Sequence, residues 1–305
     1  MTTLKEETLK VQGAPARLMR GGSRGAPVAL FVHGGAPGVT PFCGGAHVWG
    51  AALDRFLAER QVVVPDLPGS GGTGVPSGGL AFDGLAFDGL AQHVAALIEA
   101  LDLRDVHFVG HDLGGLIGLV LAMDKPERLA AVSVVASAMS APQGDSLDDL
   151  VFADPPVPLW SRLSQAWALE RLCHSHFAVD DALLDACVAA AGGQAHRSAV
   201  ETMAGDGYAR RFAPGVTRAK MRLWEKLRTV GLPVPVQLVW GSHDPTTTQE
   251  RGAVLFAAVA ERQTATHYHL VNRAGNLLFR DQPEAFHHVV AAFQDGVMAS
   301  RAAAE

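Results

Sequence analysis

The stretch VGHDLGG, residues 109–115, decides the fold, because an apolar run ends there in a glycine-rich turn and a helix-like run follows. Gly110, Gly114 and Gly115 allow a strained turn between a strand and a helix. The turn places Asp112 at its apex, at the end of the strand. The free N–H groups and the dipole of the following helix favour an anion at this position. The simpler alternative is an aspartate that caps the helix in an ordinary strand–helix turn.

Short apolar runs recur on both sides of this turn, separated by helix-like stretches. Several runs are almost continuously apolar, which is typical of parallel strands buried on both faces. The expected strands cover residues 26–35, 61–69, 105–112, 131–137, 235–244 and 266–272, and the expected helices cover 47–59, 88–102, 114–124, 249–262 and 282–296. This alternation predicts an α/β fold with a mostly parallel central sheet and helices on both faces. Residues 4–22 could add two antiparallel strands at one edge.

The alternation stops between residues 139 and 230, where no convincing core strand appears. The segment contains a proline-rich turn, DPPVP at residues 154–158, and helical patterns such as DDALLDACVAAA at residues 180–191. A helical insertion between two sheet strands predicts a cap over a site, although it could also be a helical excursion without a function. We therefore expect a core domain from residues 1–138 and 231–305, and a helical cap from residues 139–230.

Composition and charge exclude several classes of partner. The 305 residues are 48% hydrophobic and 18% charged, which is ample material for a buried core. The net charge of −6 argues against a nucleic-acid or an anionic-membrane surface, since both need clustered Lys and Arg. Three widely spaced cysteines do not suggest a disulfide framework, and no apolar run resembles a signal peptide or a membrane span. We expect a cytoplasmic protein without membrane partners, and the sequence leaves a homodimer open.

Two further motifs carry polar groups that could work with Asp112. FVHGGAPG, residues 31–38, is a glycine-rich turn after a strand, and such turns expose backbone N–H groups. The N–H groups of Gly35 and of Leu113, the residue after Asp112, would form a pair of oxyanion donors. VWGSHDP, residues 239–245, places Asp244 just beyond another strand, where an acid could orient a catalytic base. The alternative for Asp244 is a plain turn aspartate before a proline.

In order and spacing, these motifs resemble the α/β-hydrolase superfamily. The resemblance covers most of the chain and rests on HGG at 33–35, DLPGSGGT at 66–73, GHDLGG at 110–115, GSHDP at 241–245 and AGNLLFRDQPEAF at 274–286. HGGAPG is similar to the loop of the meta-cleavage-product C–C hydrolases, which normally carry a serine nucleophile. GHDLGG is similar to the turn of epoxide hydrolases and haloalkane dehalogenases, which carry an aspartate nucleophile. The resemblance implies a hydrolase that acts on a small, largely apolar organic substrate.

One position departs from these families. Asn276 stands in AGN where the families have the histidine that serves as base. An Asp112 carboxylate could still attack a carbon that bears a leaving group and form an ester, but an amide cannot activate the water that hydrolyses this ester. Asn276 is either native or a replacement that traps the covalent intermediate. If it is native, Asp112 could instead act as the acid or base of a lyase or C–C hydrolase.

The remaining site residues are less well indicated. His111, Tyr208 and Trp224 are candidate substrate contacts, although each could equally be a packing residue. We expect neither His111 nor another nearby histidine to replace the missing base, and His111 is expected to pack beside the turn. The histidines at 174, 176, 287 and 288 lack a second ligand cluster, so we expect no metal and no other cofactor. A binding protein without catalytic activity, which keeps the pocket, is the alternative from another class.

Overall fold

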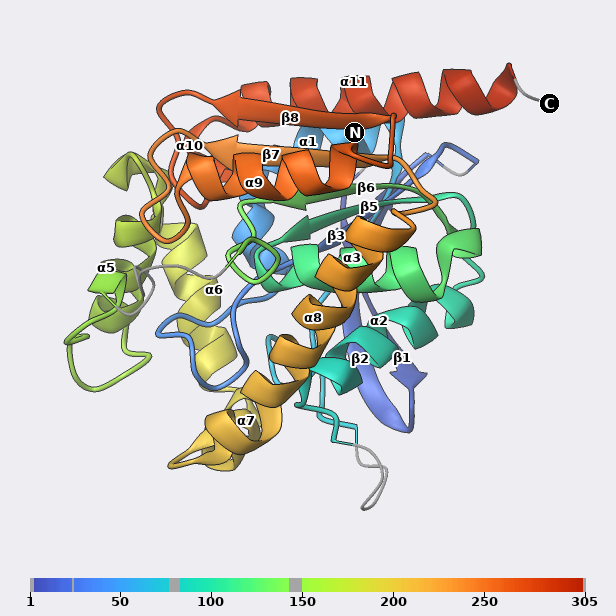
Figure 1. Ribbon diagram of the computed structural model, residues 1–305. Coiled ribbons are helices and arrows are strands. Elements are labelled where there is room, and N and C mark those ends of the chain that lie inside the picture. Colours follow the sequence, from blue (N-terminus) through green and yellow to red (C-terminus); the bar gives the residue numbers. More distant parts are fainter. Residues whose placement is uncertain (1–2, 24, 77–82, 143–149, 304–305) are drawn as a thin grey trace.

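The computed structural model describes residues 3–23, 25–76, 83–142 and 150–303. Its centre is an eight-stranded sheet with the strand order β1-β2-β4-β3-β5-β6-β7-β8 (Figure 1). The strands are β1 (Lys5–Val11), β2 (Ala14–Gly22), β3 (Val28–Val32), β4 (Gln61–Pro65), β5 (Val106–His111), β6 (Leu129–Val135), β7 (Val236–Gly241) and β8 (Thr266–Val271). β1 pairs with β2, and β2 with β4, in the antiparallel direction, and the other neighbouring strands are parallel. The predicted α/β fold with a mostly parallel sheet is therefore confirmed.

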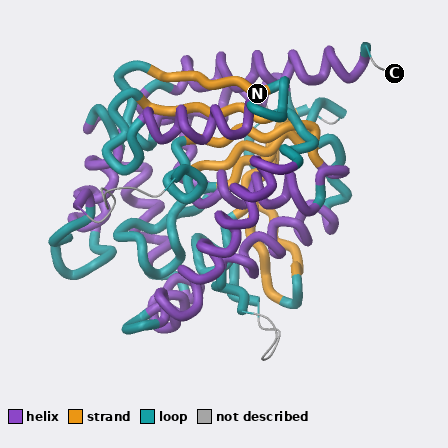
Figure 2. The backbone as a smooth tube through the Cα atoms, in the orientation of Figure 1, coloured by secondary structure: helices purple, strands orange, loops and turns teal. Residues whose placement is uncertain are grey.

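Helices cover both faces of the sheet and form two layers. One face is covered by α2 (Phe87–Ala100), α3 (Leu113–Asp124), α8 (Ala213–Thr229) and α9 (Gln249–Ala260). The other face is covered by the short helices η1 (Ala46–Leu53), α1 (Asp54–Glu59) and α10 (Leu278–Asp281) and by the long α11 (Pro283–Ala302). Figure 2 shows the strands enclosed between these layers. β3, β4, β5, β6 and β7 are almost wholly buried, which explains their continuous apolar runs.

The segment between β6 and β7 is helical, as expected. It contains α5 (Arg162–Leu172), η4 (His176–Ala178), α6 (Asp181–Ala191), α7 (Gln194–Met203), the π-helical turn η5 (Tyr208–Phe212) and α8. α6 contacts η1 of the core, while α8 runs along α2 and α3. The last part of this segment therefore packs against the core helices and belongs to the same apolar cluster.

Candidate functional site

The predicted turn after β5 adopts the strained geometry that its sequence suggests. Asp112 has φ 44° and ψ −107°, a left-handed conformation that a residue with a Cβ rarely adopts. Two hydrogen bonds to the end of β6 hold this backbone: Asp112 N donates to Val135 O at 2.9 Å, and the Ser137 hydroxyl donates to Asp112 O at 2.6 Å. The surrounding structure thus fixes the Asp112 side chain at the end of the sheet.

The glycines of the turn are needed because backbones touch there. A Cβ on Gly114 would lie 2.2 Å from Val32 O of β3, and a Cβ on Gly110 would lie 2.2 Å from Gly114 O. Both distances are far inside van der Waals contact, so no other residue fits without moving a strand or the helix. The strand–turn–helix arrangement is therefore set by the sequence GHDLGG itself.

Two backbone N–H groups lie beside the turn without an acceptor. Among the described residues, neither Gly35 N nor Leu113 N donates a hydrogen bond, although the neighbouring Ala36 N donates to Thr40 Oγ1 at 2.8 Å. Gly35 has φ 89°, which directs the loop after β3 through a tight turn. These free donors are at the positions where the sequence predicts an oxyanion site.

A cavity of about 380 Å³ opens between this turn and the helical segment. The Asp112 side chain lines it, and its Oδ1 is buried without a hydrogen-bond partner among the described residues. The other lining residues are Gly35, Ala36, Val39, Thr40, Pro41, Phe42, His111, Ala138, Met139, Phe152, Leu172, Tyr208, Thr246 and Asn276. The lining is mostly apolar with a few polar groups, as is usual for a site that takes a small organic molecule.

The predicted residues do not all reach this cavity. Asp112, Gly35, Asn276, His111 and Tyr208 line it. Tyr208 comes from η5 and stacks on Phe212, with ring centroids 5.4 Å apart. Trp224 of α8 does not line it, because its indole points to Ser140 O at 3.4 Å. Thr40 and Thr246 were not singled out from the sequence, although the hydroxyl run that follows Asp244 was a usable signal.

Asn276 occupies the centre of a buried polar cluster. Its Nδ2 donates to Asp244 Oδ2 at 3.2 Å, to Thr246 Oγ1 at 3.1 Å and to Ala136 O at 3.3 Å. Its Oδ1 lies 2.8 Å from His111 Nε2. The cluster joins Asp244 to the residue that precedes Asp112, so the predicted acid and the predicted base position do meet.

Asp244 is 7% exposed and is held by several donors. Its Oδ1 accepts hydrogen bonds from Thr246 N at 2.9 Å, from the Thr246 hydroxyl at 2.8 Å and from Thr247 N at 3.1 Å. Burial raises the pKa of Asp244 to about 6, against the opposing effect of these hydrogen bonds. This carboxyl therefore changes its charge close to neutral pH.

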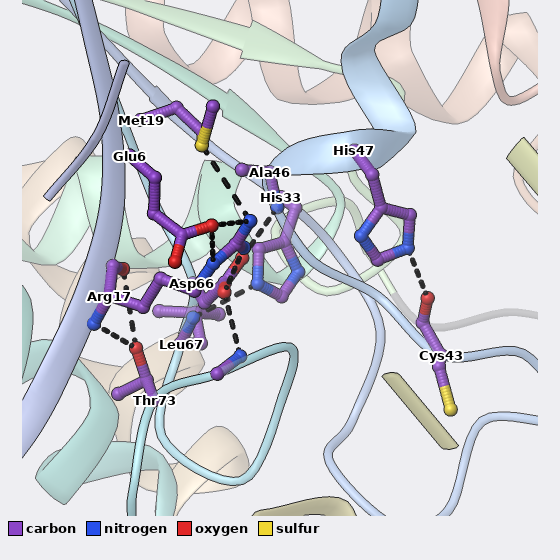
Figure 3. A network of polar contacts seen from close by, with 11 residues as sticks. Glu6, Arg17, Met19, His33, Cys43, Ala46, His47, Asp66, Leu67 and Thr73 are labelled. Carbon is purple, nitrogen blue, oxygen red and sulfur yellow. Dashed lines mark hydrogen bonds and ion pairs between the residues drawn. The ribbon is translucent and has the colours of Figure 1, made fainter. Parts of the chain in front are cut away.

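A second polar network holds the segments that follow β3 and β4 (Figure 3). Asp66, which is fully buried, accepts hydrogen bonds from Arg17 at 2.7 Å, from Ala46 N at 2.7 Å and from Gly72 N at 2.8 Å. His33 Nε2 accepts from Leu67 N at 3.0 Å, and its Nδ1 lies 2.8 Å from Gly34 O. The network connects β2 to the loop that carries Gly35.

The loop after β3 also touches the helical segment through its backbone. A Cβ on Gly38, which has φ 70°, would lie 2.5 Å from the carbonyl carbon of Ala199 in α7. A Cβ on Gly69 would lie 2.9 Å from Ala199 Cβ. α7 therefore rests directly on the two glycine-containing loops.

Neither a metal centre nor a membrane span is evident in the described part of the chain. There, no group of three or more His, Cys, Asp or Glu side chains is placed to bind a metal ion. Over the same residues, every helix is too short or too polar to cross a bilayer.

Known proteins of several chemical classes resemble this chain, including a hydrolase and a dehalogenase. A 2-hydroxy-6-oxo-2,4-heptadienoate hydrolase from Pseudomonas putida is 30% identical over 148 residues, 48% of this chain and 50% of the relative. A fluoroacetate dehalogenase from a Burkholderia species is 31% identical over 109 residues, 36% of this chain and 34% of the relative. The matched part of this chain spans about half the length of the first curated relatives.

The fold is shared over almost the whole chain with solved structures. The structure of a 2-hydroxy-6-oxo-6-phenylhexa-2,4-dienoate hydrolase from a Rhodococcus species superposes with a TM-score of 0.74 at 18% identity, covering 96% of this chain and 99% of that one. The model of the alpha/beta hydrolase fold family matches residues 27–275. With this match, and with the strand order and strained turn described above, the chain belongs to the α/β-hydrolase family.

Proposed function

We propose that the protein is a hydrolase of small, largely apolar organic molecules, and that Asp112 is its nucleophile. The observation that supports this most is Asp112 at the cavity, with Oδ1 buried and without a partner among the described residues, in a cavity that Gly35 also lines. An unpartnered buried carboxylate oxygen is costly, and such costs concentrate at functional sites.

An aspartate nucleophile suits an epoxide or a carbon–halide substrate. A carboxylate needs no base to activate it near neutral pH. It attacks a saturated carbon that bears a leaving group and forms an ester. When water then attacks this ester, the negative charge develops on the second carboxyl oxygen, where the Gly35 and Leu113 N–H groups would stabilise it.

Residues 139–230 are proposed as the cap of this site, over a core of residues 1–138 and 231–305. Phe152, Leu172 and Tyr208 of this segment line the cavity and give it an apolar roof with one hydroxyl group.

Mass spectrometry of the intact protein tests this proposal. The protein is incubated with panels of small epoxides and haloalkanes, and the reaction is sampled from the first turnover onward. We expect a substrate-sized adduct on Asp112, turnover to the alcohol or diol, or both, and the matched Asp112→Asn variant should show neither. Reversible binding, with no adduct and no product from any substrate in the wild type, would instead support the non-catalytic alternative.

A C–C hydrolase or lyase is the second candidate, and similarity to named ring-fission-product hydrolases favours it. Asp112 would then move a proton and not form a bond to carbon. Turnover of a ring-fission product that is lost in Asp112→Asn, with no Asp112 adduct at any time, would select this candidate over the first.

A further inference from the structure

The hydrogen bonds of Asn276 fix the tautomer of His111. Because Asn276 Nδ2 faces the acceptors Asp244, Thr246 and Ala136 O, its Oδ1 is the acceptor that faces His111 Nε2 at 2.8 Å. His111 must therefore carry its proton on Nε2 and donate it to the amide. In a neutral imidazole of this tautomer the basic lone pair is on Nδ1.

His111 Nδ1 and Asp112 Cβ both face the loop at Gly34. A Cβ on Gly34 would lie 2.8 Å from His111 Nδ1 and also 2.8 Å from Asp112 Cβ, so the two groups flank the same point. The His111 ring lines the cavity and meets Phe279 edge-on, with centroids 5.1 Å apart. The imidazole is thus held in place from two sides beside Asp112.

The protonation state of His111 suits an acceptor of protons. Burial lowers the pKa of His111, while the neighbouring Asp112 and the hydrogen bond to Asn276 act in the opposite direction. The ring is neutral at pH 7 and can take a proton. The Asp244 carboxylate, connected through the Asn276 amide, would stabilise the positive charge that forms.

We propose that His111 is the general base that activates water to hydrolyse the Asp112 ester. Asn276 holds the His111 ring in position and connects it to Asp244. In this arrangement Asn276 is a positioning residue, and the base comes from the strand that carries the nucleophile. The inference rests on the proposed ester intermediate at Asp112. It differs from the expectation drawn from the sequence, where His111 only packs beside the turn.

The step balances with water as the only co-reactant. The water oxygen bonds to Cγ of the Asp112 ester, and its proton passes to His111 Nδ1. The negatively charged oxygen then re-forms its double bond to Cγ, and the bond from Cγ to the ester oxygen breaks. The leaving alcohol oxygen takes the proton from His111. Asp112 is left as a carboxylic acid that contains one oxygen from water, and it returns to the carboxylate by releasing the second water proton to the solvent. Nothing is oxidised or reduced.

His111→Gln is the decisive variant. A glutamine side chain can still donate an N–H to Asn276 Oδ1 but has no basic nitrogen. With a substrate that the wild type turns over, we expect the variant to form the Asp112 adduct at the wild-type rate. It should then hydrolyse the adduct about 10²–10⁴-fold more slowly, which is the usual contribution of a general base. The adduct would accumulate to one equivalent in the intact mass.

The possible results separate this inference from the proposal on which it rests. A His111→Gln protein that hydrolyses its adduct at the wild-type rate would overturn the role of His111, as would a wild type that itself forms a permanent adduct. In both cases Asp112 remains a nucleophile. Absence of an adduct from both proteins at all times would reject the ester intermediate instead.

Asn276→Leu tests the positioning half of the proposal, and it serves if His111→Gln does not fold. Leucine has a similar volume but removes the acceptor for His111 Nε2–H and the link to Asp244. We expect adduct formation to continue and adduct hydrolysis to slow by about tenfold, because a misaligned base loses only part of its effect. Unchanged hydrolysis in this variant would remove Asn276 from the mechanism.

Discussion

The two halves of the site are built in different ways. The proposed attacking half, which consists of Asp112 and the Gly35 and Leu113 N–H groups, is fixed by backbone contacts and glycines. The proposed proton-handling half, which consists of His111, Asn276, Asp244 and Thr246, is fixed by hydrogen bonds between buried side chains. A change in the first half moves the backbone and endangers the fold, whereas the second half can exchange side chains while the fold persists. Asn276, where the sequence predicts a departure from the resembled families, therefore lies in the half that is held by side chains.

Gly114→Ala is expected to have the largest effect and to break the attacking half. The new Cβ would lie 2.2 Å from Val32 O, a backbone atom of a buried strand that cannot turn aside. We expect more than about 4 kcal/mol of destabilisation, at or beyond the upper end for overpacked cores. Denaturant unfolding or the yield of folded protein would measure it.

Gly296→Ala is the matched control for that substitution. Gly296 lies in α11, and an added Cβ would meet nothing within 4 Å. Alanine there should raise the free energy of unfolding by about 0.5–1 kcal/mol. Equal tolerance of both substitutions would contradict the description of the attacking half as backbone-limited.

Asp66→Ala should have the next largest effect. It removes the centre of the polar network that connects β2 to the loop carrying Gly35, and this network supports the attacking half. It leaves Ala46 N and Gly72 N without an acceptor and Arg17 without its buried partner. We expect a loss of about 3 kcal/mol in the free energy of unfolding, as is usual when one partner of a buried ion pair is removed.

Glu6→Ala removes the other carboxylate that pairs with Arg17. Because the Glu6 side chain is 58% exposed, its loss should cost less than about 1 kcal/mol. Urea unfolding of the two variants measures the difference, and similar losses would show that the Asp66 network does not support the loops.

Thr246→Val should have the smallest effect of these substitutions. It tests the proton-handling half through the pKa of Asp244. The Thr246 hydroxyl donates to Asp244 and thereby lowers the Asp244 pKa, which burial has raised to about 6. Without the hydroxyl, ionisation of Asp244 needs a higher pH. If turnover requires ionised Asp244, the acid limb of the pH–rate profile should move upward by roughly 0.7 unit, which corresponds to one net hydrogen bond of about 1 kcal/mol.

Thr247→Val is the matched control for this shift. Thr247 reaches Asp244 through its backbone N–H at 3.1 Å, and valine keeps that group. The acid limb should therefore stay in place. A limb that does not respond to Thr246→Val, or that moves equally in both variants, would show that another group controls it.

The parts of the fold that depend on burial and on glycine were predictable from the sequence. The continuous apolar runs predicted the parallel strands, and GHDLGG predicted a strained turn at Asp112, because both patterns have few structural solutions. The expected helix at residues 282–296 ends too early, because α11 continues to Ala302. The last residues of α11 contain no signal that marks its end.

The contacts between polar side chains were less predictable. His111 and Asn276 are 165 positions apart, and no local pattern shows that their side chains meet in the folded chain. Trp224 was expected at the substrate and lies outside the cavity, because the direction of an aromatic on a helix depends on how that helix packs. The position of Asn276 could be identified from its neighbours in the sequence, but its partners could not.

The contact between α7 and the loop after β3 links the position of this helix to the loop that carries Gly35. Gly38 and Ala199 approach so closely that α7 cannot move far from the core without freeing residues 36–40 or carrying them along. These residues continue directly from Gly35, whose N–H is one of the two proposed donors. A displacement of α7 toward this loop would therefore also shift the backbone that carries the proposed donor.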